Sequence, residues 1–123
     1  MTAAPTDSFS RIILASAGLF GALGIAAAAG ATHSGNAQFL GPASTICLAH
    51  APTLLALGLM APRNTSWKIA MVLLAVGTLV FVGDLGMRQF SGVSLFPLAA
   101  PAGGSLLIAG WLVTIFAAMF ARR

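Results

Sequence analysis

The chain has 123 residues, of which 59% are hydrophobic and 7% charged, and its formal net charge is +4. A typical soluble domain contains about a quarter charged residues, so the composition excludes an ordinary soluble protein and indicates a fold surrounded by lipid. The basic residues are scattered without interleaved aromatics, so no nucleic-acid partner is expected. The length fits one compact unit, and the single Cys47 excludes an intrachain disulfide.

Four apolar stretches follow one another along the chain, and each can cross the roughly 30 Å hydrocarbon core as a helix. Backbone amides in lipid must be satisfied within their own segment, which favours helices throughout. We therefore predict an all-α membrane protein with four transmembrane helices in a single bundle. The predicted spans are 12–31, 43–61, 69–85 and 102–121, between a short N-terminal tail (1–11) and a basic end (122–123).

The first span contains Ala-x-Ala triplets near Ala27–Ala31, as a cleaved signal peptide would. Its apolar run is longer than the roughly 7–15 residues of a signal sequence, and further spans follow it directly. We therefore expect this span to be retained in the protein.

Two features interrupt the apolar pattern. Pro52 removes a helical hydrogen bond and leaves the carbonyl of Leu48 without its helical donor, so it should kink the second helix. The connection 86–101 contains Pro97 and Pro101 and cannot be one continuous helix. Because this connection is itself apolar, we expect it to lie in the membrane interface or to fold over the bundle.

The basic residues predict the orientation of the bundle, because Lys and Arg accumulate in cytoplasmic loops. With an even number of spans, five of them fall on one side: Arg11, Arg63, Lys68, Arg122 and Arg123. Arg88 alone falls on the other side, close to Asp84, which can neutralise it. Both termini should therefore face the cytoplasm, with the protein in a bacterial cytoplasmic (inner) membrane.

Small residues should allow the helices to pack closely, since lipid supplies no hydrophobic force for association. The first span has one at every fourth position, and the fourth span begins with two glycines. The predicted packing residues are Gly18, Ala22, Ala26, Gly30, Gly103, Gly104 and Gly110. Packing within the chain and packing between copies are both compatible with this pattern.

Four ionisable residues fall in the half of the bundle predicted to be outer: His33, His50, Asp84 and Arg88. Such residues inside a membrane are candidates for a functional site. Asp84 and Arg88 stand four residues apart, a spacing that forms ion pairs on a helix, so a structural lock is the simpler interpretation. His50 lies about 10 Å inside its predicted span and needs a partner, either Asp84 or a carbonyl exposed by Pro52.

Cofactor and catalytic patterns are weak. His33 and His50 differ by about 10 Å in predicted depth, which disfavours haem between two histidines. Cys47 and His50 share a helix face, but two ligands do not make a zinc site. The sequence has no phosphate-binding glycine loop and no nucleophile elbow. We expect no cofactor, no metal and no enzyme activity.

Four segments together resemble a known family: "GALGIAAAAGATH", "LAHAPTLLALGL", "AVGTLVFVGDL" and "LFPLAAPAGGSLLIAGW". The chain is similar, over about residues 12–115, to small bacterial membrane proteins of domain-of-unknown-function family 423. The most specific pieces are the block from Pro101 to Trp111 and the two histidines. The resemblance implies four membrane helices and no established activity. Many members have a less charged, aromatic segment in place of "GDLGMR", and a histidine one residue before the position of His33.

Two functions remain open from the sequence. The first is a non-enzymatic structural or accessory subunit that associates with itself or with a larger membrane complex. The second is a bundle that binds a small molecule, an ion, a lipid or a quinone through His33, His50, Asp84 and Arg88. A cavity shared by these side chains would favour the second function.

Overall fold

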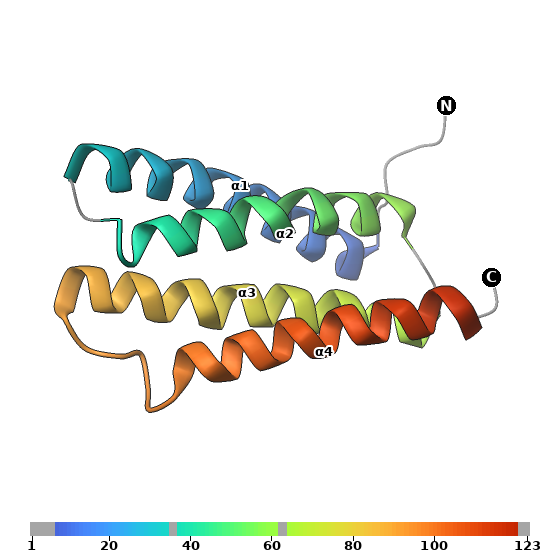
Figure 1. Cartoon of the computed structure of the whole chain (residues 1–123). Helices are drawn as coiled ribbons and strands as arrows, with labels where there is room; N and C mark the ends of the chain where they lie inside the picture. The colour runs from blue at the N-terminus through green and yellow to red at the C-terminus, as the bar shows by residue number, and fades with distance from the viewer. Residues whose placement is uncertain (1–6, 35–36, 62–63, 121–123) are drawn as a thin grey trace.

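Four antiparallel helices form a single bundle in the computed structural model, which describes residues 7–34, 37–61 and 64–120. Within these residues the helices are α1 (Ser8–Ser34), α2 (Leu40–Met60), α3 (Thr65–Ser91) and α4 (Ala99–Phe120). Each of these four is long and apolar enough to cross a membrane. The start of α1 and the end of α4 lie at the same end of the bundle (Figure 1). The predicted fold class is confirmed.

The helices extend beyond the predicted spans, because apolarity marks the lipid-embedded part and not the whole helix. Each begins three or four residues before its span, and α3 continues to Ser91, six residues past the predicted limit at Leu85. Gly92 ends α3 in a left-handed conformation (φ 76°), and its N–H bonds to the carbonyl oxygen of Arg88 at 3.1 Å. Asp84 therefore lies about two turns inside α3, deeper than a residue that caps the helix end.

The bundle consists of two helical hairpins, α1 with α2 and α3 with α4. Between the hairpins, α2 packs against α3 and α1 touches α3 only slightly, while no Cα atom of α2 comes within 8 Å of one in α4. The arrangement of α1 and α2 above α3 and α4 is visible in Figure 1. Any bond from α2 to α4 must therefore be made by long side chains.

Close approach in the first hairpin depends on Gly24 of α1. A Cβ atom on Gly24 would lie 2.7 Å from Cγ of Leu48, so a side chain there would force the helices apart. The absence of that side chain lets the buried hydroxyl of Ser44 donate to the carbonyl oxygen of Gly24 at 2.8 Å. An interhelical hydrogen bond of this kind stabilises helix association in lipid.

The second hairpin has a similar seam of glycines. A Cβ atom on Gly103 would lie 2.6 Å from the backbone nitrogen of Phe81, and one on Gly77 would lie 3.0 Å from the carbonyl oxygen of Gly103. One on Gly110 would meet Leu74 at 2.8 Å. Backbone therefore packs directly against backbone between α3 and α4, with Gly103 and Gly110 at the contact as the sequence suggested.

The other predicted packing residues face away from this core. A Cβ atom on Gly18 or Gly104 would meet no atom within 4 Å, and Ala22 and Ala26 are exposed. Of the four predicted packing residues on α1, only Gly30 closely approaches another helix, since a Cβ atom there would lie 3.0 Å from Cδ1 of Leu40. The buried face of α1 is instead formed by Ser10, Ile13, Ala17, Phe20 and Gly24.

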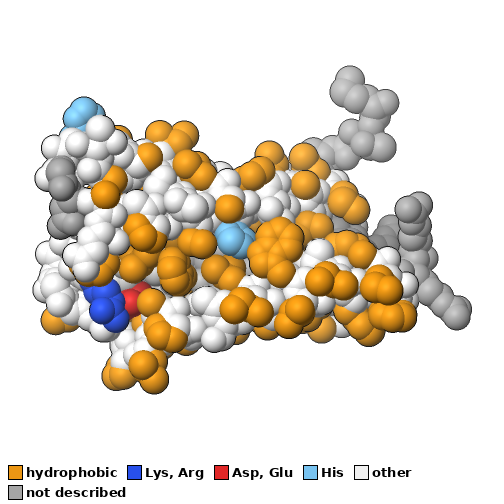
Figure 2. Space-filling model, viewed as in Figure 1, with side chains coloured by type: hydrophobic (Ala, Val, Ile, Leu, Met, Phe, Trp, Pro, Cys, Tyr) orange, Lys and Arg blue, Asp and Glu red, His pale blue; other side chains and the backbone are white. Residues whose placement is uncertain are grey.

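Apolar side chains cover the outside of the bundle as well as its core. Leu54, Met71 and Leu74 are completely buried, whereas Ile25 and Met119 are 66% and 70% exposed. Hydrophobic side chains spread along the visible face in Figure 2. In water such a surface would drive aggregation, but in a bilayer it is the surface that lipid contacts.

Pro52 lies inside α2, which continues as one helix from Leu40 to Met60. The kink predicted at Pro52 stays a prediction.

The end of the bundle where the chain begins carries charged residues outside the apolar region. The carboxylate of Asp7 accepts the N–H of Ser10 at 3.0 Å and so satisfies one of the open donors at the start of α1. Hydrogen bonds from the backbone N–H and from the side chain of Ser10 hold the pKa of Asp7 below its usual value. Lys68 of α3 places its Nζ 5.6 Å from the ring centroid of Phe9.

Three of the basic residues that predicted the orientation, Arg63, Arg122 and Arg123, lie outside the described residues.

Candidate functional site

His50 occupies the middle of α2 and is only 5% exposed. Because α2 begins at Leu40, His50 lies ten residues, or about 15 Å, along the helix. Its Nδ1 lies 2.8 Å from the carbonyl oxygen of Ile46, one turn earlier. The partner expected from the sequence was Asp84 or a carbonyl opened by Pro52; the structure supplies the carbonyl of Ile46.

Trp111 of α4 provides the second bond of His50. Its indole Nε1–H donates to Nε2 of His50 at 3.1 Å, and the two ring centroids are 5.8 Å apart. A carbonyl accepts at Nδ1 and an indole donates at Nε2, so the contacts assign a neutral imidazole with its proton on Nδ1. Both ring nitrogens are therefore engaged within the chain.

Sequence reasoning did not identify Trp111 as a partner. The available signal was its position: tryptophan favours the two membrane interfaces, yet Trp111 lies near the middle of α4 (Ala99–Phe120). A mid-membrane indole needs an acceptor for its N–H, and His50 is at the corresponding depth on α2. The pairing required knowledge of which helices are neighbours.

Asp84 is completely buried, and its Oδ2 accepts a hydrogen bond from Nε of Arg88 at 2.8 Å. The side chain of Arg88 is 36% exposed. The ion pair at i,i+4 has thus formed as its spacing suggested, with the carboxylate inside and the guanidinium at the rim. Such an arrangement keeps the buried charge neutralised while the cation remains partly solvated.

The second carboxylate oxygen of Asp84 holds the connection between α3 and α4. Its Oδ1 accepts the backbone N–H of Leu95 at 2.8 Å, across 11 residues of sequence. The connection is apolar and exposed, with Val93 at 58% and Leu98 at 74%. Asp84 therefore fastens an apolar segment back onto α3, which agrees with the expectation of a connection folded onto the bundle.

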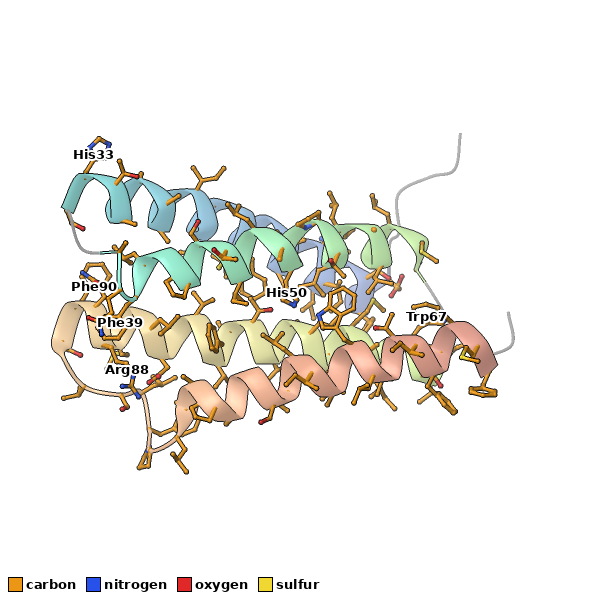
Figure 3. The ribbon with its side chains drawn as sticks, viewed as in Figure 1. His33, Phe39, His50, Trp67, Arg88 and Phe90 are labelled. Carbon is orange, nitrogen blue, oxygen red and sulfur yellow. The ribbon has the colours of Figure 1, made fainter. Side chains whose placement is uncertain are left out.

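His33 lies in the last turn of α1 and is exposed. Figure 3 shows it at the tip of α1, far along the bundle from His50. The two histidines also appear as separate patches on the surface in Figure 2, and the adjacent acidic and basic side chains lie apart from both histidines. The structure therefore brings Asp84 and Arg88 together, pairs His50 with Trp111, and leaves His33 apart from both.

Among the described residues no three His, Cys, Asp or Glu side chains are close enough together to hold a metal ion. Cys47 is buried one turn before His50, but both imidazole nitrogens already have partners. A metal or haem iron at His50 would have to displace Trp111 from Nε2. His33 lies too far along α1 to serve as a second axial ligand (Figure 3).

A groove of about 440 Å³ opens between α1, α2 and α3. Its walls are almost entirely apolar and run along α1 from Phe20 to Gly30 and along α3 from Leu79 to Phe90, with Leu40 and Ala43 contributed by α2. None of the four predicted site residues is among the residues that line it. This groove is thus separate from the four polar groups.

The fold and these contacts define a small four-helix membrane protein in which the buried side chains of His50 and Asp84 bond within the chain. Residues 17–104, more than half of the chain, match the model of the family described as Protein of unknown function (DUF423). The chain belongs to this family, as its resemblance had suggested. Comparison with curated proteins and with solved structures gives no match.

Proposed function

We propose that this protein is a non-enzymatic structural or accessory component of the bacterial cytoplasmic membrane, which associates with itself or with a larger membrane complex. The observation that supports it best is the use made of the buried polar groups. His50 and Asp84 are buried ionisable side chains in the described helices, and each makes one bond within its own helix and one bond to another element of the bundle. These side chains therefore support the packing of the bundle.

A second observation supports association through α1. Gly18 and Ala22 stand one turn apart on an exposed face of this helix, and a Cβ atom on Gly18 would meet nothing within 4 Å. Small residues at this spacing let a second helix approach closely in lipid. Within the described part of the chain, no helix covers this face.

The proposed orientation places both termini in the cytoplasm. Arg11 on α1 and Lys68 on α3 lie at the end of the bundle where α1 begins, and both are exposed. The cation at the other end, Arg88, is paired with Asp84. Among the described residues, net positive charge is therefore found at the end where α1 begins, which is the asymmetry that retains loops in the cytoplasm.

The alternative, a ligand site formed by His33, His50, Asp84 and Arg88, has weaker support. These side chains do not meet, and the groove of about 440 Å³ is lined by other residues. A ligand at Nε2 of His50 or at the carboxylate of Asp84 would have to replace a bond that the fold already uses.

The test is purification from native membranes in a mild detergent, followed by native electrophoresis, mass spectrometry of associated proteins and an absorption spectrum. We expect a species larger than one chain, which Ala22→Leu shrinks and which Ala118→Leu, at an exposed position on α4, leaves intact. A single chain without companions would refute the proposal. A haem absorption band would refute the absence of a cofactor.

A further inference from the structure

The groove between α1 and α3 exists because small residues face each other across it. Ala26, Ala27 and Gly30 on α1 stand opposite Gly83 and Gly86 on α3, and a Cβ atom on Gly86 would meet no atom within 4 Å. Since α1 touches α3 only slightly, no side chain fills the space between them. The hollow is therefore a property of the helix arrangement.

The chemistry of the walls restricts what can occupy this space. A buried water needs about two to four polar partners, and the lining residues are Ala, Gly, Val, Leu and Phe. A polar or charged ligand would lose its hydration without compensation. An empty hollow would forfeit the dispersion contacts of its lining, so a hydrocarbon group is the occupant that fits.

The length and position of the groove restrict the occupant further. From Phe20 to Gly30 along α1 is ten residues, or about 15 Å at the helical rise. This equals half of the roughly 30 Å hydrocarbon core. The groove ends near mid-bundle at Phe20, which is 2% exposed, and reaches the other end at Leu40, the first residue of α2, and at Phe90.

We propose that this groove is a binding site for one hydrocarbon chain of a membrane lipid, taken from the leaflet that surrounds the α1–α2 connection. A chain of one leaflet spans the same depth as the groove, whereas a transmembrane helix of a second copy would cross both leaflets and extend past Phe20, where the groove ends. The bound lipid completes the contact between the two hairpins, where α1 touches α3 only slightly. This inference goes beyond the proposed accessory role and does not depend on a partner.

The test uses the full chain reconstituted in phosphatidylcholine vesicles that contain a lipid with a photoactivatable diazirine in the middle of one acyl chain. After irradiation, mass spectrometry locates the labelled residues. We expect labelling of segments 20–30 and 79–90 to exceed that of the exposed α4 residues Ile108 and Ile115 several-fold. Equal labelling of all exposed apolar segments would overturn the proposal.

Gly86→Leu should fill the groove and lower its labelling several-fold, and Ala26→Leu provides a second filled variant if the first does not fold. Gly104→Leu is the matched control, because a Cβ atom there also meets nothing within 4 Å and Gly104 lies outside the groove. Undiminished labelling in folded Gly86→Leu and Ala26→Leu would refute the site. A disulfide between copies that carry Leu23→Cys, together with an unlabelled groove, would show a second copy as the occupant and would also refute it.

Discussion

The indole N–H of Trp111 donates to Nε2 of His50 at 3.1 Å, and this bond joins two hairpins whose helices α2 and α4 have no close backbone contact. The bond lies near the middle of both helices, at a depth where the hydrocarbon core of a bilayer holds no water to compete for the donor or the acceptor. His50 is 5% and Trp111 42% exposed, and the bond between them fixes the register of the hairpins: sliding one hairpin along the other would leave the indole N–H and Nε2 of His50 without each other.

Trp111→Phe should therefore destabilise the bundle by about 1–2 kcal/mol, because Nε2 of His50 loses its donor in an apolar environment. Thermal unfolding in detergent measures the change. In a double-mutant cycle with His50→Leu we expect a coupling of about 0.5–1.5 kcal/mol. Strictly additive effects would show that the hydrogen bond contributes nothing to stability.

Asp84→Asn should destabilise the protein by about 1–3 kcal/mol, because Arg88 loses its counter-charge. The side chain of Arg88 is partly exposed, so the effect should be smaller than for a fully buried ion pair. Combination with Arg88→Gln should restore part of the loss. Asp84→Ala should be worse than Asp84→Asn, because it also removes the acceptor for the N–H of Leu95.

Asp7→Asn is the charge-matched control for Asp84→Asn, since it removes the other acidic residue at an exposed position. It should leave the melting temperature nearly unchanged. Equal melting of the wild type and all Asp84 variants would exclude the structural lock.

Gly103→Ala should destabilise the α3–α4 hairpin by about 1–3 kcal/mol or more, because the new methyl group would collide with the backbone of Phe81. Its neighbour offers the opposite case. Gly104→Ala places the methyl group in open space and should stabilise the helix by up to about 1 kcal/mol. If the two alanine variants melt alike, the glycine seam does not control packing.

The first turn of α1 should respond to acid through Asp7. The pKa of Asp7 is lowered in the folded protein, so its contribution is complete above the unfolded pKa of about 3.9 and is lost as the pH falls through the lower folded value. Amide exchange at Ser10, corrected for its intrinsic pH dependence, should quicken in that acidic range. Asp7→Asn should abolish the pH dependence, and retention of the dependence in that variant would contradict the assignment.

The orientation can be measured with single cysteines in a Cys47→Ala background. We expect a membrane-impermeant thiol reagent to label His33→Cys in intact cells and to reach Thr65→Cys, which is also exposed, only after lysis. The reverse pattern would place both termini outside the cytoplasm.

The sequence by itself determined the solvent and the architecture. A chain with 59% hydrophobic residues and four long apolar stretches can satisfy its backbone in lipid only as helices, and the i,i+4 spacing of Asp84 and Arg88 already predicted their ion pair. Periodicity along one helix carries such local information without any knowledge of neighbours.

Only the tertiary structure decided which faces meet. The small residues Gly18 and Gly103 are alike in sequence, yet one faces outward and the other touches the backbone of Phe81. Because α1 is apolar on every side, no hydrophobic pattern distinguishes its buried face from its lipid-facing one. For the same reason the partners of His50 and Asp84, namely Trp111 and the N–H of Leu95, emerged only when the two hairpins were placed together.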